Sequence, residues 1–160
     1  MAEQKTNVMR FLEQKKVRYI PHEYPHGDTA VDGLTVAGLI GKDAACVFKT
    51  LVARGASRNV YVFVVPVAAE LDLKKAAKAA GEKSVEMVHV SEITALTGYV
   101  RGGCSPIGMK KQYRTFLDGS AAGQESIVVS AGKIGAQVEL ALEELVRLTR
   151  AAMADISKEP

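Results

Sequence analysis

The chain has 160 residues, of which 48% are hydrophobic and 24% charged, and its formal net charge is +3. This length suits one domain, and the high hydrophobic fraction with a small net charge excludes a disordered chain. The longest apolar run, residues 60–69, is interrupted by Pro66 and is shorter than the roughly 20 residues of a membrane helix. The N-terminus is charged throughout, which excludes a signal peptide, so we expect one cytoplasmic domain over residues 1–160 without membrane contact.

The N-terminal part of the sequence predicts two helices and a strand. Thr6 is a typical N-cap, and the residues after it place apolar side chains on one helix face. Residues 18–24 predict a short strand, which the proline within it confines to a sheet edge. Asp32 is expected to cap a second helix over residues 33–40, which Gly41 ends.

The middle of the sequence predicts a hairpin, a helix and a further strand. Residues 46–53 and 60–67 are rich in valine and aromatic residues and flank a turn of five residues, which is typical of a β-hairpin. Asp72 is expected to cap a helix that Gly81 ends, with alanines on one face. Residues 85–90 then predict a strand.

The C-terminal part of the sequence is rich in strands between two helices. Ser91 is expected to cap a short helix over residues 91–96. Three β-type runs follow, at residues 113–117, 126–129 and 134–140. The last helix is expected to carry apolar residues from Leu142 to Ile156 towards the core, with Glu143 and Arg147 paired on its outer face. Strands outnumber helices and several follow one another directly, which favours a single α+β domain on a mixed sheet over a doubly wound fold.

Lys49 is the most informative residue, because it lies inside a β-type apolar run. On a strand, Val47 and Leu51 share its face, while Phe48 and Val52 lie on the other. Removing an ammonium from water is costly unless it gains a partner or changes its pKa. Lys49 is therefore a candidate for binding an anionic group or for acid–base chemistry. The alternative is an edge lysine whose side chain extends into solvent.

Residues 98–108 form a glycine-rich loop that contains the pair Gly102-Gly103. Without side chains, a ligand could approach the backbone there, and successive N–H groups could receive an anion or an oxyanion. The alternative is that the pair only serves a turn. Cys104 and Ser105 follow, but no histidine lies near in sequence to activate them, so a covalent mechanism is not expected. The cysteines and histidines have no metal-ligand spacing, so no metal or cofactor is expected.

Basic residues gather around these segments of the sequence, and they would form a phosphate-binding surface if the fold brings them together. The alternative is that they are ordinary solvated side chains. They are Lys74, Lys75, Lys78, Lys83, Arg101, Lys110, Lys111, Arg114 and Lys133.

Several blocks of the sequence resemble the YbaK/EbsC family, and they come in the family's order over nearly the whole chain. The blocks are residues 48–52, residues 66–68 with 71–76, residues 98–108, and residues 130–135 before Glu139-Leu140. The resemblance implies a mixed, barrel-like sheet with flanking helices, related to the editing domain inserted in bacterial prolyl-tRNA synthetases. It also implies hydrolysis in trans of the ester of mischarged tRNA, above all Cys-tRNA(Pro), without a metal or cofactor.

The resemblance also implies roles for individual residues. Lys49 would be the essential residue that orients the 3′-terminal phosphate or ribose of tRNA. Gly102 and Gly103 would place backbone amides around the scissile carbonyl, and the thiol of the substrate itself would attack the ester. The residues expected to shape the substrate pocket are Tyr24, Thr50, Ser105, Ser130 and Gln137. Those expected to bind tRNA are Lys110, Lys111 and Lys133. The expected partners are tRNA and, as a further candidate, prolyl-tRNA synthetase.

Three positions depart from the family's pattern. Asp32 replaces a common aromatic residue, Ile134 a common arginine and Gln137 a common aspartate. Joint loss of the arginine and the aspartate is expected if they form a pair, and it predicts a less charged pocket. Two alternatives stay open: the same reaction on another amino acid such as alanine, and a module that binds tRNA or a synthetase without turnover.

Overall fold

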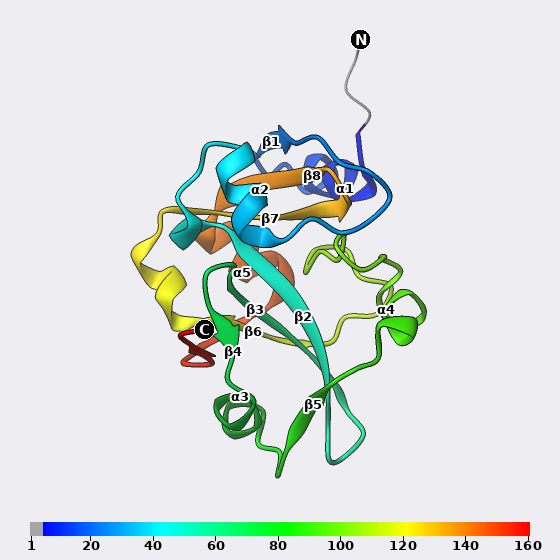
Figure 1. Cartoon of the computed structure of the whole chain (residues 1–160), viewed down its shortest axis with the longest axis vertical. Helices are drawn as coiled ribbons and strands as arrows, with labels where there is room; N and C mark the ends of the chain where they lie inside the picture. Colours follow the sequence, from blue (N-terminus) through cyan, green and yellow to red (C-terminus); the bar gives the residue numbers. More distant parts are fainter. Residues whose placement is uncertain (1–4) are drawn as a thin grey trace.

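The computed structural model describes residues 5–160, in which two main sheets and a two-stranded one are accompanied by helices (Figure 1). The helices are α1 (Asn7–Gln14), α2 (Gly33–Leu39), α3 (Leu73–Ala80), α4 (Val90–Thr97) and α5 (Leu142–Thr149), with short 3₁₀ helices η1 (Ala44–Cys46) and η2 (Gly119–Gly123). The strands are β1 (Ile20–Glu23), β2 (Phe48–Gly55), β3 (Val60–Pro66), β4 (Glu70–Leu71), β5 (Val85–Met87), β6 (Arg114–Asp118), β7 (Ser126–Lys133), β8 (Ala136–Ala141), β9 (Ala152–Ala154) and β10 (Ser157–Lys158).

The larger sheet has five strands in the order β5-β2-β3-β6-β9 and the smaller has three in the order β1-β8-β7. The larger sheet is mixed, since β5, β2 and β3 are antiparallel while β3, β6 and β9 are parallel. A parallel bridge between Val47 and Val128 links the two sheets. The predicted α+β fold with a mixed sheet and flanking helices is confirmed, although the strands form separate sheets without closing into one barrel.

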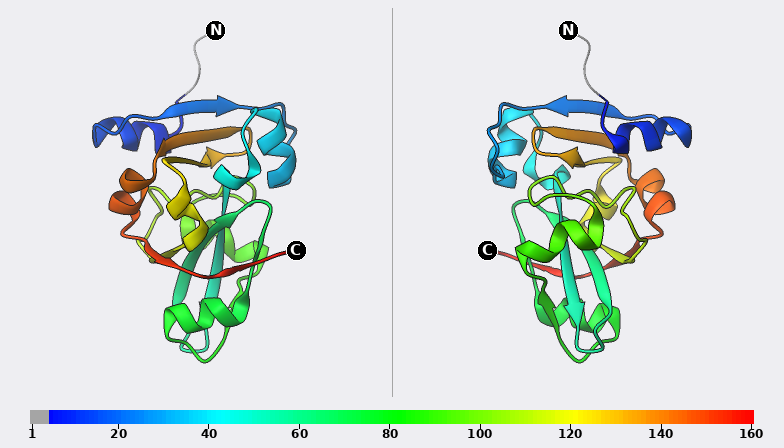
Figure 2. Two further views of the ribbon diagram at one scale, coloured as in Figure 1. Left: turned by 90° about the vertical axis from the view of Figure 1, so that its left-hand side faces the viewer. Right: turned by 90° about the vertical axis from the view of Figure 1, so that its right-hand side faces the viewer.

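The main core lies between the two sheets, and the side views in Figure 2 show the smaller sheet across one end of the larger. Phe48, Val64 and Leu117 of the larger sheet share this core with Val129 and Val138 of the smaller one. A second core lies between the larger sheet and α3, where the rings of Phe63 and Phe116 stack with centroids 5.5 Å apart.

The predicted starts of the first three helices are confirmed. Thr6, Asp32 and Asp72 each accept hydrogen bonds from backbone N–H groups of the first turn of the following helix. Gly81 ends α3 with φ of 73°, a left-handed conformation that favours glycine. The strand predicted around Pro21 is β1, which lies at the edge of its sheet as expected.

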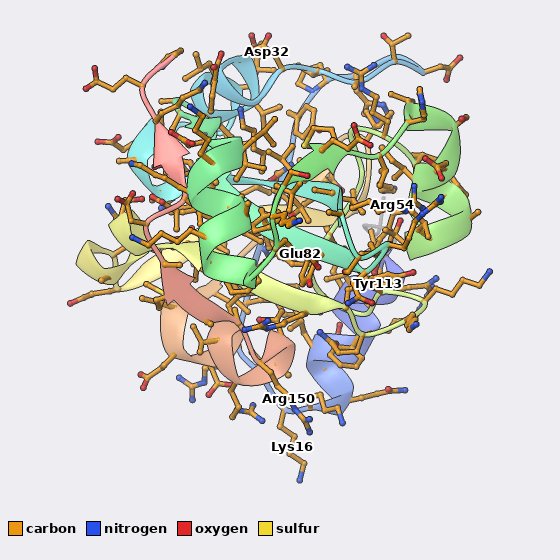
Figure 3. The ribbon with its side chains drawn as sticks, turned by 90° about the horizontal axis from the view of Figure 1, so that it is seen from below. Lys16, Asp32, Arg54, Glu82, Tyr113 and Arg150 are labelled. Atoms are coloured by element: carbon orange, nitrogen blue, oxygen red, sulfur yellow. The ribbon has the colours of Figure 1, made fainter. Side chains whose placement is uncertain are left out.

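Several predicted boundaries in the second half of the chain are wrong. The N-cap of α4 is His89, not Ser91, and its N–H donates to the Glu92 carboxylate at 3.1 Å. Arg54 on β2 pairs with the same carboxylate at 3.1 Å and lies beside α4 in Figure 3. Strand β8 begins at Ala136 and not at residue 134, because Gly135, with φ of 94°, belongs to the turn before it.

The last helix is also shorter than predicted. It ends at Thr149, whose hydroxyl donates to the Leu145 carbonyl oxygen at 2.8 Å, and Arg150 adopts φ of 57° at the end of the helix (Figure 3). The chain then forms β9, so Ile156 reaches the core from beyond a strand and not from the helix. Arg147 pairs with Glu144 at 2.6 Å, which corrects the predicted pair with Glu143.

A buried carboxylate holds the C-terminal residues against the larger sheet. Asp118 at the end of β6 is 2% exposed and accepts the backbone N–H groups of Ile156 and Ser157, both at 3.1 Å. Beyond these residues β10 pairs with β4. Within residues 5–160, no helix is both long enough and apolar enough to cross a membrane.

Candidate active site

A pocket of about 370 Å³ lies between β2, α2, α4 and the glycine-rich loop that follows α4. Its walls are mainly apolar side chains, among them Val31, Val36, Val47, Leu51, Val67, Val88 and Ile93. Polar side chains reach it from separate elements, namely Tyr24, Lys49, Thr50, Arg101, Cys104, Ser130 and Gln137. A small apolar pocket with a few convergent polar groups is typical of a site for a small ligand.

Six of the sequence-predicted site residues therefore come together here, since Gly102 also lines this pocket. Gly103, Ser105 and the three lysines predicted to bind tRNA do not line it. Ser105 is fully buried, and its hydroxyl accepts the N–H of Ile107 at 3.2 Å. The hydroxyl of Ser105 therefore stabilises the loop from inside.

Lys49 projects from β2 into this largely apolar surrounding. Burial lowers the pKa of its ammonium group, and the negative charge of Glu70 opposes that shift only in part. Among residues 5–160, the ammonium has no hydrogen-bond or ion-pair partner. A partly desolvated cation without a partner is stabilised by a bound anion, which makes Lys49 the strongest ligand-binding candidate in the pocket.

Two further polar groups in the pocket have no partner. The Thr50 hydroxyl is buried and forms no hydrogen bond with any described residue. Gln137 is 7% exposed, and its side-chain amide has no hydrogen-bond partner within residues 5–160. It lies on β8, opposite Ser130 of β7 and His22 of β1. Buried polar groups are nearly always hydrogen-bonded, so the fully buried Thr50 hydroxyl is a candidate for a hydrogen bond to a ligand.

The glycine-rich loop approaches other parts of the chain too closely for side chains. Gly102 has φ of 84°, and a Cβ atom there would lie 2.6 Å from the Cβ of Ala30. A Cβ atom at Gly103 would lie 2.8 Å from the Cα of Lys133 in β7. The two glycines thus allow the loop to pack between the segment before α2 and the β7–β8 hairpin.

The backbone donors of this loop differ in availability. The N–H of Gly103 already donates to the carbonyl oxygen of Val100 at 3.0 Å. In the described part of the chain, the N–H groups of Gly102 and Cys104 donate to no residue. These two groups, which belong to residues that line the pocket, are therefore available to a ligand.

The Cys104 thiol is a poor nucleophile in this setting. Burial raises its pKa to about 11, and the hydrogen bond to Thr97 lowers it only in part. The reactive thiolate is therefore scarce at neutral pH, and no histidine lines the pocket to generate it.

The three lysines predicted to bind tRNA are exposed, and two of them flank the glycine-rich loop. The Cβ of Lys110 lies 3.6 Å from the position of a Cβ at Gly98, and the backbone of Lys133 packs against Gly103. The ammonium of Lys111 lies 5.7 Å from the centroid of the Tyr113 ring.

Several pocket residues were not predicted from the sequence. Ala30 and Val31 line the pocket from the segment before α2, while Val90 and Ile93 line it from α4. These are ordinary apolar residues far apart in the chain, and no sequence signal distinguishes them from core residues. Arg101 was predicted only as one of the basic residues of a possible phosphate-binding surface, and it also lines this pocket.

A charged cluster lies on β8 two residues beyond Gln137. Glu139 is 8% exposed and contacts His22 at 2.9 Å, Lys42 at 3.0 Å and Ser126 at 2.8 Å. Burial by itself would raise the pKa of this carboxyl group, but hydrogen bonds from these three residues lower it to about 2. Glu139 is therefore ionised and fully paired beside the pocket.

Comparison with known proteins identifies the class to which this fold and site belong. Residues 25–148 match the family model of the aminoacyl-tRNA editing domain, so the chain belongs to this family. EbsC of Enterococcus faecalis, which is assigned as a Cys-tRNA(Pro)/Cys-tRNA(Cys) deacylase, is 48% identical over 98% of this chain and 95% of its own. The predicted relation to the YbaK/EbsC family is thus confirmed.

Two further relatives support the family assignment. The uncharacterized protein YwhH of Bacillus subtilis is 28% identical over 68% of this chain and 69% of its own. A crystal structure assigned as a trans-editing enzyme for prolyl tRNA synthetase superposes with a TM-score of 0.82 at 25% identity, over 98% of this chain and 99% of that one. The fold is therefore shared over nearly the whole of both chains.

Proposed function

We propose that this protein hydrolyses, in trans, the ester bond of misacylated tRNA, with Cys-tRNA(Pro) as its principal substrate. The assigned activity of EbsC and the family match support the reaction class. The observation that carries the proposal is the unpaired, partly desolvated Lys49 in the wall of a small apolar pocket that also contains Gly102. A volume of about 370 Å³ is large enough to hold a cysteinyl group.

In this proposal, Lys49 and the glycine-rich loop bind different parts of the substrate. The Lys49 ammonium binds the phosphate of the terminal nucleotide. This contact gives the cation an anionic partner and places the ester bond in the pocket. The free N–H groups of Gly102 and Cys104 stabilise the negative charge that develops on the carbonyl oxygen. Gly103, whose own N–H is occupied, supplies the close packing that holds this loop in place.

The attacking group comes from the substrate in this proposal, because the Cys104 thiol is not activated and no histidine among the described residues lines the pocket to activate a hydroxyl. The cysteinyl sulfur attacks the carbonyl carbon, a carbon–sulfur bond forms and the ester carbon–oxygen bond breaks. The proton of the thiol passes to the ribose oxygen as that oxygen leaves, and water then opens the resulting thiolactone to free cysteine. Tyr24, Thr50, Ser130 and Gln137 shape the space around the acyl group, while Lys110, Lys111 and Lys133 contact phosphates further along the tRNA.

The direct test is release of the amino acid from Cys-tRNA(Pro), Ala-tRNA(Pro) and Pro-tRNA(Pro) by the purified protein. We expect rapid release of cysteine and little release of proline. Lys49→Ala should lower the rate at least 100-fold with an unchanged melting temperature, while Lys78→Ala on the exposed face of α3 should not. Cys104→Ser should stay within about threefold of wild type, since its thiol is not the nucleophile.

Other outcomes of this assay contradict the proposal in distinct ways. Faster release of alanine than of cysteine would show that the pocket serves another acyl group. Binding of all three tRNAs without release would indicate a module without turnover. Full activity of Lys49→Ala would show that the reaction does not need Lys49.

We also propose prolyl-tRNA synthetase as a protein partner, because the related crystal structure is named for that synthetase. Analytical ultracentrifugation of the two purified proteins with and without tRNA(Pro) tests this. A sedimenting complex is expected, and independent sedimentation under both conditions would refute the partnership.

A further inference from the structure

Among the described residues, the side chains that line the pocket carry positive charge and no negative charge. Of its lining side chains only Lys49 and Arg101 are charged at neutral pH, and both are cations. An aminoacyl ester, however, carries an amino group beside the carbonyl, and this group is an ammonium in its protonated form. A site built for an ammonium would present a carboxylate to it.

No carboxylate of the described residues lines the pocket, and three that lie close to pocket residues in the sequence are already occupied or exposed. Glu139, two residues from Gln137, is paired with Lys42 and His22. Asp32, next to the pocket residue Gly33, caps α2 by accepting from the N–H and the hydroxyl of Thr35. The negative charge of Glu70 raises the pKa of Lys49 in part, but Glu70 is exposed and does not line the pocket.

Gln137 lies at a position where a charged side chain could contact the amino group of the substrate. Its side chain is among the most buried polar groups of the pocket, at 7% exposed, and its amide has no partner within the described chain. A neutral amide can both donate to and accept from an uncharged amine or hydroxyl. It cannot supply the charge that a desolvated ammonium requires.

We propose that the pocket accepts the acyl group with an uncharged substituent beside the carbonyl, and that Gln137 is the specificity-determining residue for this preference. The pocket would then bind aminoacyl esters with the amino group in its uncharged form, and it would also bind α-hydroxyacyl esters of the same size. This inference rests on the proposed function, because it concerns the same pocket and the same ester.

The energetics favour the uncharged form. The phosphates of bound tRNA would satisfy Lys49 and Arg101, which leaves the ammonium of the substrate as the one charge without a partner. An α-amino group titrates at about pH 7.7–8.0, so binding the free amine costs only about a six- to elevenfold loss of available substrate at pH 7. Burial of an unpaired ammonium costs far more than this.

The test compares two tRNA(Pro) esters that differ in one atom group: the cysteinyl ester and its α-hydroxy counterpart, the 3-mercaptolactyl ester. Both keep the thiol that attacks the carbonyl. The value of kcat/KM for each ester is divided by its rate of hydrolysis without enzyme, which removes the difference in intrinsic reactivity. We expect the two normalised values to agree within tenfold for the wild-type protein.

Gln137→Glu provides the matched variant, because it changes charge with almost no change in size. The new carboxylate can pair with the substrate ammonium, so the normalised preference for the cysteinyl over the mercaptolactyl ester should rise at least tenfold. The melting temperature of the variant is measured alongside, and the wild-type comparison decides the question if the variant does not fold.

The outcomes separate this inference from the proposed function. If the wild-type protein cleaves the cysteinyl ester and its normalised rate on the mercaptolactyl ester is more than tenfold lower, the inference is wrong while the deacylase function stands. An unchanged preference in a folded, active Gln137→Glu variant would also refute the role of Gln137. If neither ester is cleaved, the proposed function fails and the inference fails with it.

Discussion

Individual polar residues show which roles in the site can be predicted from the sequence and which cannot. Lys49 was predicted as a site residue because a lone cation in an apolar β-type run has few ways to avoid a costly environment. The structure places it in a pocket wall, where its ammonium has no partner among residues 5–160. Gly103 and Ser105 were predicted for the same site, but one backbone N–H and one hydroxyl are used within the loop. Such local hydrogen bonds cannot be predicted from the sequence, because they depend on the exact path of the loop.

Glu139 is the residue whose charge is expected to affect stability most. Its pKa of about 2 lies below the ordinary value of 4.5, so the ionised carboxylate stabilises the folded state at neutral pH. This stabilisation is lost as the pH falls from about 4.5 towards 2. Glu139→Gln should therefore lower the free energy of unfolding at pH 7 by about 2–3 kcal/mol and weaken its dependence on acid pH.

Urea denaturation of the wild-type protein and the variant between pH 2 and 7 measures this effect. Glu125→Gln is the matched control, because Glu125 is exposed and precedes the same cluster in sequence. A variant as stable as wild type at pH 7 would show that the contacts of Glu139 with Lys42 and His22 contribute nothing net.

At the level of elements, the glycine-rich loop and the β7–β8 hairpin support each other. Gly103→Ala would place a methyl group 2.8 Å from the Cα of Lys133, and backbone atoms there cannot move aside independently. We expect a loss of about 1–3 kcal/mol in stability, typical of overpacking, together with at least a tenfold loss of deacylation. Gly103 does not have positive φ, so the effect would come from contact and not from backbone strain.

Gly123→Ala is the control for this substitution, since no atom lies within 4 Å of its added methyl group. Differential scanning calorimetry and the Cys-tRNA(Pro) assay report the two effects. Equal behaviour of the two variants would mean that the loop and the hairpin are not tightly coupled.

The helix boundaries were predicted correctly where neighbouring residues alone determine them. The caps at Thr6, Asp32 and Asp72 and the glycine stop at Gly81 depend on neighbouring residues alone, and all are confirmed. The end of α5 was not predicted, because neither glycine nor proline marks it. There the hydroxyl of Thr149 and the left-handed Arg150 end the helix, and pairing of β9 with distant β6 stabilises the extended chain that follows.

At the scale of the whole molecule, exposed basic residues near the pocket predict how tRNA binding depends on salt. Replacing Lys110 and Lys111 together by alanine should reduce the slope of log Kd against log salt concentration by roughly 1–1.5, since each phosphate contact contributes about 0.7 for single strands. The control is the pair Lys74→Ala and Lys78→Ala on α3, which lies away from the smaller sheet in Figure 1. Fluorescence anisotropy of labelled tRNA(Pro) between 50 and about 300 mM salt measures both slopes. An unchanged slope in the first variant would place the tRNA on another face.

The position of residues 152–158 in the fold has a consequence for synthesis of the protein. Strand β9 completes the larger sheet, and the buried carboxylate of Asp118 obtains two of its hydrogen bonds from Ile156 and Ser157. While a ribosome still holds these residues, β6 has an open edge and Asp118 lacks those donors. An open edge can pair with another nascent chain. We therefore expect the larger sheet to become fully stable only after residues 152–158 have left the ribosome.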